Sequence, residues 1–202
     1  MKEVTPRNYS MKKRSAKAHT NEIRIKESFR DLWMEHALPE ITLEQVAERA
    51  GVTVRTVLRK FDSKEGLITA SIQYAANQAM ERESVEAGDL DAAVTALMKE
   101  YESMGDAVVR TIRLEGELPA AAEILQLGRT KHRKWCEDVF SPYLPQKRKA
   151  MRKEKLLAFI AATEVYLWKL LRRDLKNSRA ATHRIFLELV RGIAENQKTP
   201  QP

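Results

Sequence analysis

Cysteine, glycine and proline are all scarce in this sequence of 202 residues. Cys136 is the single cysteine, so an intrachain disulfide is excluded, which fits a reducing compartment. Glycine and proline number seven each, and so few helix-breaking residues favour a mostly helical chain. Hydrophobic residues make up 43% of the sequence, which is enough apolar material for a substantial core.

Long apolar runs and enzyme motifs are also missing. No stretch approaches the roughly 18 apolar residues of a membrane span, and the basic N-terminus lacks the apolar segment of a signal peptide. We therefore expect a cytoplasmic protein that does not contact membranes. The enzyme motifs GxGxxG, GxxxxGK(S/T), HExxH, CxxC and GxSxG do not occur in the sequence. An enzyme on a helical scaffold is therefore kept only as the less favoured hypothesis of function. No cofactor is expected.

Positive charge is concentrated near the N-terminus. The formal net charge is +8, and residues 1–20 hold six lysines and arginines against one glutamate. Residues 71–106 reverse this balance with eight acidic residues against two basic ones. We interpret residues 1–20 as a basic flexible arm, which favours a polyanionic partner such as nucleic acid.

The segment ITLEQVAERAGVTVRTVLRKF, residues 41–61, carries the signals of two short helices. Thr42 and Gln45 have the spacing of a capping box, and Gly51 is suited to end the helix that follows. Thr53 can cap the next helix, which runs to about Phe61. With a preceding helix over about 21–37, this pattern predicts a helix-turn-helix.

The second helix of this pair has a basic outer face. Val57 and Phe61 are spaced to point inward, whereas Arg55, Thr56, Arg59 and Lys60 point away from the core. Arginine can bond guanine through two hydrogen bonds, and the first turn of such a helix reaches base edges in the major groove. A merely solvated outer face is the alternative, and the cap, the glycine turn and the basic arm together favour DNA.

The stretch LEQVAERAGVTVRTVLRKFDSKEGL resembles the DNA-binding segment of the TetR family of transcriptional regulators. That family shows a pattern close to A-x-x-A-G-V-S-x-x-T-(L/I/V)-Y-x-(H/Y)-F-x-S-K-E-x-L. The matching residues are Ala47, Ala50, Gly51, Val52, Thr53, Thr56, Val57, Phe61, Ser63, Lys64, Glu65 and Leu67. The resemblance covers residues 21–70, and the remainder resembles the family in its helical character and length.

The resemblance implies an all-α fold with a three-helix DNA-binding head over 21–66 and a helical ligand-binding and dimerisation domain over 67–202. It also implies a homodimer on a near-palindromic DNA duplex, acting as a repressor that an unknown small-molecule effector releases. A DNA-binding protein without a ligand, or an activator, is the alternative.

Several DNA contacts follow from the resemblance. Thr42 and Lys64 match phosphate contacts at the starts of two helices, where the helix dipole also favours an anion. Thr53, Arg55 and Thr56 match positions that reach bases or phosphates.

The sequence departs from the family pattern at three positions. Leu58 replaces the usual tyrosine and can touch a thymine methyl group instead of donating to phosphate. Lys60 replaces a histidine or tyrosine and can restore a phosphate contact. Asp62 stands where proline is common, and either Asp62 or Ser63 can cap the helix that follows.

The C-terminal half carries further helical patterns. Beyond a helix that starts near 63, an apolar stripe runs from Leu90 to Tyr101, and helices are expected near 106–114, 120–140, 148–174 and 179–196. Glu164 interrupts the apolar face from 157 to 171, so it either anchors a cationic or hydroxylated ligand or pairs with an arginine or lysine inside the dimer or at its edge. The candidate ligand-binding residues are Tyr101, His132, Trp135, Glu164 and Trp168, with ordinary core packing as the alternative for the aromatic ones. His132 and Cys136 alone do not make a metal site.

The last expected helix has an unusually broad apolar face. Phe186, Leu187, Val190 and Ile193 form its stripe, and Ile185 and Leu189 widen it. Such breadth suits burial by the chain's own domain and by a partner, so we expect two helices from each subunit to form a four-helix dimer interface. The basic run over 147–155 is read as a solvated surface, with a second nucleic-acid patch as the alternative.

Overall fold

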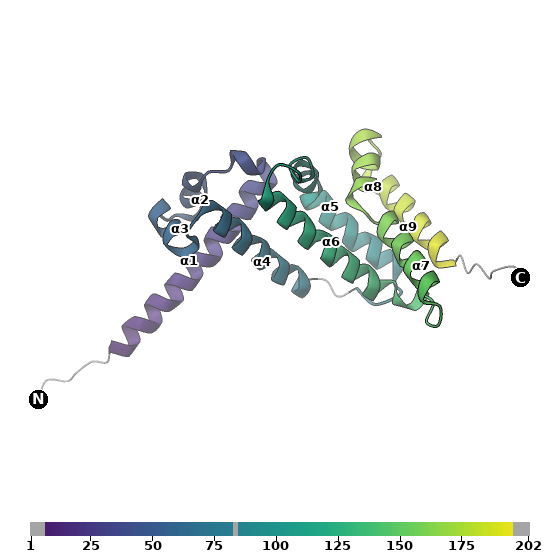
Figure 1. Cartoon of the computed structure of the whole chain (residues 1–202), viewed down its shortest axis with the longest axis horizontal. Helices are drawn as coiled ribbons and strands as arrows, with labels where there is room; N and C mark the ends of the chain where they lie inside the picture. The colour runs from purple at the N-terminus through teal and green to yellow at the C-terminus, as the bar shows by residue number, and fades with distance from the viewer. Residues whose placement is uncertain (1–6, 83–84, 196–202) are drawn as a thin grey trace, which may run out of the picture. The chain divides into compact units, whose positions relative to one another are not determined.

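The computed structural model describes residues 7–82 and 85–195, and this part of the chain contains helices and no strand, which confirms the all-α expectation (Figure 1). The chain divides into two compact units, Met1–Ala75 and Ala76–Pro202. No helix in the described part is both long and apolar enough to cross a membrane.

The N-terminal unit holds the expected helix-turn-helix. Its elements are α1 (Arg7–Glu35), the short turn η1 (Leu38–Glu40), α2 (Leu43–Ala50), α3 (Val54–Phe61) and the start of α4 (Lys64–Arg82). The second unit contains α5 (Leu90–Ile112), α6 (Pro119–Val139), the turn η2 (Ser141–Tyr143), α7 (Lys149–Ala162), α8 (Val165–Lys169), the π-helical turn η3 (Leu170–Asp174) and α9 (Arg179–Glu195).

The first helix starts earlier than the sequence pattern indicated. We expected a flexible arm over 1–20 and a helix from about 21, but α1 already begins at Arg7; residues 1–6 lie outside the described part. Residues 7–20 lack apolar periodicity, but they also lack glycine and proline and are rich in lysine, arginine and alanine. Because extending an existing helix is easy compared with starting one, good helix formers are sufficient here.

The predicted caps of α2 are confirmed. The Thr42 hydroxyl accepts a hydrogen bond from the Gln45 amide at 3.2 Å, and the Gln45 side chain accepts one from the Thr42 amide at 2.8 Å. Gly51 ends α2 at a φ of 63°. A Cβ atom there would lie 2.7 Å from the Arg24 guanidinium, which donates to the Ala50 carbonyl at the end of the helix. Glycine therefore supplies the left-handed backbone conformation that this turn requires, while the Arg24 side chain could move away from an added Cβ atom.

Helix α5 packs against α6, α8 and α9, and α7 packs against α6 and α9 (Figure 1). We expected a separate helix near 106–114, after the stripe that ends at Tyr101. This prediction is wrong, because α5 continues through Gly105 to Ile112. The Trp168 ring packs against this glycine, and a Cβ atom would lie 2.6 Å from a ring carbon. The glycine therefore provides close approach between helices rather than a chain break.

The prediction of a single helix over 148–174 is also wrong, because the helix is interrupted between α7 and α8. Thr163 donates its hydroxyl hydrogen to the Phe159 carbonyl at 2.6 Å, and Glu164 has extended backbone angles and caps α8. Short polar side chains that bond nearby backbone groups offer an alternative to helix continuation. Consequently Leu157 and Trp168 do not share one face: the first is exposed and the second is fully buried.

Glu102 of α5 holds the π-helical turn η3 against α5. The Glu102 carboxylate accepts hydrogen bonds from Arg172 at 2.5 and 2.9 Å and from the Trp168 indole at 3.1 Å. The next arginine, Arg173, pairs with Asp106 through two bonds of 2.8 Å. The hydrogen bonds from Arg172 lower the pKa of Glu102 to about 2, against the effect of burial.

We expect this carboxylate to make stability sensitive to acid. Because the folded pKa lies below the ordinary value of 4.5, the stabilisation is present above that pH and is lost as the pH falls towards 2. The shift corresponds to a contribution on the order of 3 kcal/mol. Glu102→Gln should lower the free energy of unfolding at neutral pH and flatten its decline in acid, as measured by denaturant titration. Asp138→Asn, which removes an exposed pair with Lys134, is the control and should change little. An unaltered acid profile for Glu102→Gln would contradict the assignment.

Candidate nucleic-acid interface

The outer face of α3 presents two arginines. Arg55 and Arg59 are exposed, and neither forms an ion pair with an acidic side chain among residues 18–75 and 85–195, the part of the chain whose side chains are described. On the opposite side of this helix, Val57 is fully buried and Phe61 is 8% exposed. The buried pair fixes the rotation of the helix, so both guanidinium groups are directed to solvent as the sequence predicted.

Three threonines surround the starts of α2 and α3. The Thr53 hydroxyl accepts from the Thr56 amide at 3.3 Å and lies 3.0 Å from the Thr56 hydroxyl. Thr42 caps α2 in the same manner. Thr42 and Thr53 are exposed and Thr56 is half-buried. These hydroxyls therefore lie at two helix N-termini, where partial positive charge favours an anion.

Lys60 and Lys64 have partners within their own chain, which the sequence did not indicate. The Lys60 ammonium lies 3.3 Å from Glu22 on α1, and the bond from Lys26 to the same carboxylate lowers the pKa of Glu22. Lys64 donates to the backbone carbonyl of Leu38 at 3.1 Å and to that of the next residue. Both lysines therefore also connect α3 and α4 to the rest of the N-terminal unit.

The turn between α3 and α4 explains one departure from the family pattern. Asp62 has a φ of 64°, which proline cannot adopt because its ring holds φ near about −65°. The following residue supplies the cap that the sequence left open, since the Ser63 hydroxyl accepts from the Gly66 amide at 3.0 Å.

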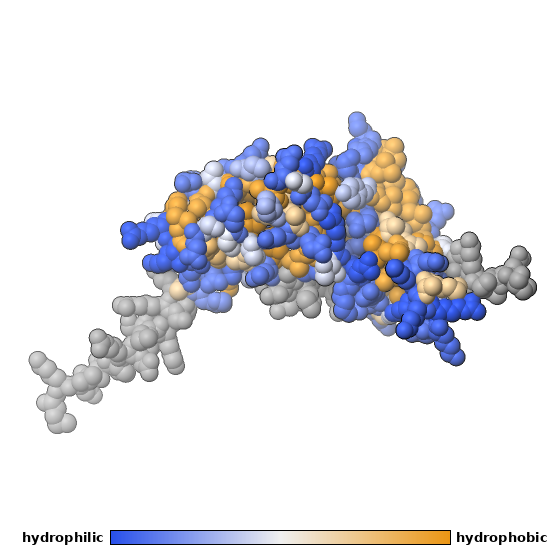
Figure 2. Space-filling view, in the orientation of Figure 1, coloured by the Kyte–Doolittle hydropathy of each residue, from blue (hydrophilic) through white to orange (hydrophobic). Residues whose placement is uncertain are grey.

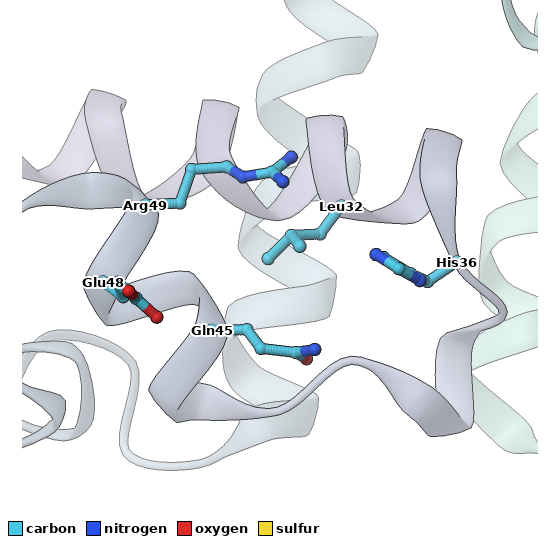
Figure 3. Close-up of a pocket in the computed structure, with 5 residues that line it drawn as sticks. All are labelled: Leu32, His36, Gln45, Glu48 and Arg49. Carbon is cyan, nitrogen blue, oxygen red and sulfur yellow. The ribbon is translucent and has the colours of Figure 1, made fainter.

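A shallow polar groove lies between the C-terminal end of α1 and α2. Figure 3 shows Leu32 of α1 and His36, which directly follows α1, facing side chains of α2 across it. Arg49 donates two hydrogen bonds to Glu35 at 2.8 and 2.7 Å, and Gln45 is engaged in its cap. The groups around this groove hold α2 against α1 and so position the turn that leads to α3.

The predicted ligand residues of the second unit are divided between core and partly exposed positions. Trp168 is fully buried and Tyr101 nearly so, with ring centroids 6.1 Å apart. The Tyr101 hydroxyl donates to the Thr163 carbonyl at 2.7 Å. The Trp168 indole donates to Glu102. These two aromatic residues therefore hold the break between α7 and α8 against α5.

His132 and Trp135 are partly exposed near the same break. The Nε2 atom of His132 lies 3.0 Å from the Thr163 hydroxyl, and its ring stacks on Trp135 with centroids 5.8 Å apart. Burial lowers the pKa of His132 and raises the pKa of Cys136 to about 12. Glu164 accepts from the Val165 amide at 3.2 Å. Within the described ranges it forms no salt bridge with a lysine or arginine and caps α8 instead, and its pairing inside a dimer stays a prediction.

The residues named for the dimer interface are mostly buried in the chain's own core. Phe186 and Val190 are fully buried, Leu187 is 8% exposed and Ile193 is half-buried. The inner part of the broad apolar stripe of α9 packs into this core. Leu189, on the outer side of the stripe, is exposed. Figure 2 shows apolar side chains gathered on the surface over α8 and α9. Large apolar side chains exposed on α7, α8, η3 and α9 are Leu157, Tyr166, Leu170 and Leu189.

No cluster of three histidine, cysteine or acidic side chains suited to a metal ion occurs among the residues that the structure describes. His132 and Cys136 do approach one another, with Nε2 and Sγ 3.7 Å apart. The Thr163 hydroxyl contacts both side chains, so the sequence spacing reflects a small polar network inside the helical bundle.

Comparisons with known proteins agree with this geometry. The family model described as bacterial regulatory proteins, tetR family, matches residues 29–70. No curated protein matches the chain. A solved transcriptional regulator from Rhodococcus sp. Rha1 is similar in fold, with a TM-score of 0.64, 16% identity, and coverage of 85% of this chain and 95% of that one. A TetR transcriptional regulator from Rhodococcus sp. RHA1 has a TM-score of 0.52 and 19% identity, and covers 88% of this chain and 98% of its own.

Proposed function

The chain belongs to the tetR family of bacterial regulatory proteins, and on that premise we propose that it represses transcription as a homodimer on a near-palindromic operator, until a small-molecule effector releases it. The family makes it a DNA-binding transcriptional regulator rather than an enzyme. Repression, the homodimer and release by an effector are our proposals.

The main support for the proposal is the basic, exposed outer face of α3. Arg55 lies in the first turn of this helix and Arg59 one turn further on, and both are exposed without an acidic partner in the described ranges. Arginine pairs with the O6 and N7 atoms of guanine through two hydrogen bonds. We assign base reading to Arg55 and a contact nearer the groove wall to Arg59.

Contacts with the phosphate backbone would flank this helix. Thr42 and Thr53 occupy helix N-termini, where a phosphate oxygen is favoured by both the dipole and the hydroxyl. Thr56 can reach a base or a phosphate. Lys60 and Lys64 have intramolecular partners, but an ammonium group has three donors and can also bond a phosphate.

The proposed dimer uses the exposed apolar side chains of the second unit. Leu157 and Leu189 lie on α7 and α9, which pack against each other, and Tyr166 and Leu170 belong to the segment between them. A second copy that covered this surface would complete a four-helix arrangement. Two heads on one face of the DNA would then contact half-sites roughly 34–36 Å apart, or a multiple of that distance.

For the effector we propose the region around the break between α7 and α8. His132, Trp135 and Glu164 are partly exposed there, beside the buried Tyr101 and Trp168. The hydrogen bond between His132 and Thr163 joins α6 to the break. A ligand that replaced this bond and stacked on Trp135 would alter how the helices pack, which gives it a route to affect DNA binding.

Removing residues 1–17 should weaken binding to all DNA sequences about equally. This segment is strongly basic and carries no base-reading signal. Each phosphate contact that is lost should flatten the dependence of log affinity on log salt by about 0.9. Removing residues 196–202, which contain a single lysine, is the matched control. An unchanged salt slope after the N-terminal truncation would show that this segment does not contact the backbone.

Genome-wide mapping of bound DNA, followed by a compound screen for release, tests the proposal. A near-palindromic consensus, footprinted symmetrically, is the expected result. Compounds that release the operator from the wild type but not from Trp135→Ala would support the effector region. An asymmetric single half-site would contradict the dimer, and increased transcription from bound promoters would favour an activator.

A further inference from the structure

Leu58 is an exposed apolar side chain within the basic face of α3. It is 39% exposed, and it lies between Arg55, three residues earlier, and Arg59, which follows it directly. A single exposed leucine is ordinary on a protein surface. Its location on the face that we assign to the major groove is what calls for an explanation.

The geometry of α3 fixes where this side chain lies. The helix turns by about 100° per residue, so Leu58 is displaced about 100° from the fully buried Val57 and only about 60° from Arg55. Val57 and Phe61 anchor the inner side of the helix. Any approach of DNA that lets Arg55 reach a base edge therefore also brings Leu58 to the floor or wall of the same groove.

The chemistry of the major groove offers one apolar partner. Base edges there present hydrogen-bond donors and acceptors, and the exception is the C5 methyl group of thymine. An isobutyl side chain pressed against polar edges would remove water from them without replacing the lost hydrogen bonds. Against a thymine methyl group, the same contact removes apolar surface from water on both sides.

We propose that Leu58 determines sequence preference by contacting the methyl group of a thymine next to the base pair that Arg55 reads. This inference rests on the proposed function, because it requires α3 to enter the major groove. It adds a hydrophobic determinant to a surface that otherwise recognises DNA through charge and hydrogen bonds.

The test replaces thymine by deoxyuracil, which lacks only this methyl group. The operator is first selected from random duplexes with the wild-type protein, and each thymine is then exchanged singly. Losing one contacted methyl group should weaken wild-type binding by about fourfold, and losing its symmetric mate as well should weaken it by about 15-fold in total. Leu58→Ala should bind the intact operator more weakly and should not respond to the exchange at that position.

Two comparisons make the result specific. Leu175→Ala also truncates an exposed leucine, in the second unit, and should keep the wild-type response to deoxyuracil at every position. Reselection of random duplexes with Leu58→Ala should lose the thymine preference at the same position while keeping the rest of the consensus. Circular dichroism should show a folded variant, because Leu58 is not part of the core and alanine is a good helix former.

The possible outcomes distinguish a failure of the role of Leu58 from a failure of the proposed function. Sequence-selective binding with the same deoxyuracil profile for the wild type and Leu58→Ala would overturn the role of Leu58 and leave the regulator assignment intact. Failure of the wild type to select any duplex over scrambled DNA would overturn the proposed function, and this inference with it.

Discussion

Replacing Leu157 and Leu189 by glutamate together is expected to yield a folded monomer that has lost at least about 100-fold in operator affinity. Both side chains are 41% exposed on packed helices, so the chain alone tolerates charge at these positions. In a dimer, the four carboxylates would be buried without partners, which costs several kcal/mol. Separate heads lose the gain of about 10²–10⁴ that linked binding provides. Analytical ultracentrifugation and titration on the operator measure both effects.

A matched variant controls for the added negative charge. Gln126→Glu with Gln146→Glu adds the same charge at two exposed polar positions that are not part of the proposed apolar surface and should remain a dimer with nearly unchanged operator binding. Leu187→Glu with Val190→Glu should instead unfold, because those side chains belong to the chain's own core. A folded dimer of Leu157→Glu with Leu189→Glu would exclude this surface from the interface.

Arg55→Ala should cost about 1–3 kcal/mol on the selected operator and relax the preference at one base pair, because the variant loses a contact with a base edge. Arg59→Ala should weaken binding more evenly across sequences, because we assign its side chain to a contact nearer the groove wall. Both variants should stay folded, since neither guanidinium is buried and alanine favours the helix. The measurement compares operator and scrambled duplexes at one fixed salt concentration.

The two arginines serve as controls for each other, because each substitution removes one positive charge from the same helix. Equal losses on both duplexes for Arg55→Ala would assign this side chain to the phosphate backbone. No loss on either duplex would mean that the basic face of α3 is only solvated.

The features that the sequence predicted well are decided locally. The capping box at Thr42 and Gln45, the left-handed turn at Gly51 and the cap at Thr53 each depend on residues within about one helical turn. The inward direction of Val57 likewise follows from helical spacing within α3. For this reason, the helix-turn-helix and the outer face of its second helix could be placed before the structure.

The features that the sequence missed depend on distant residues. Lys60 meets Glu22, and Lys64 meets the Leu38 carbonyl, across separations of 38 and 26 residues. Gly105 looked like a chain break, and only the Trp168 ring packed against it explains its place inside α5. No local pattern indicates such contacts.

The broad stripe of α9 shows a different limit. The sequence spacing showed that the apolar face of α9 is wider than burial from one side requires. It did not show which part of that face points into the core. The structure assigns Phe186 and Val190 to the core and Leu189 to the surface. The separation depends on where α5 and α7 pack against α9, and helical periodicity within α9 does not contain that information.

The most direct test of sequence-specific DNA binding compares the affinity of the whole chain for a selected near-palindromic duplex with its affinity for a scrambled duplex of the same composition, at one fixed salt concentration near the physiological value. Specific regulators typically bind their sites about 10³–10⁷-fold more tightly than other DNA, and we predict a ratio of at least about 10³. Equal affinities for the two duplexes would contradict the account, because the outer face of α3 would then attract DNA through charge alone.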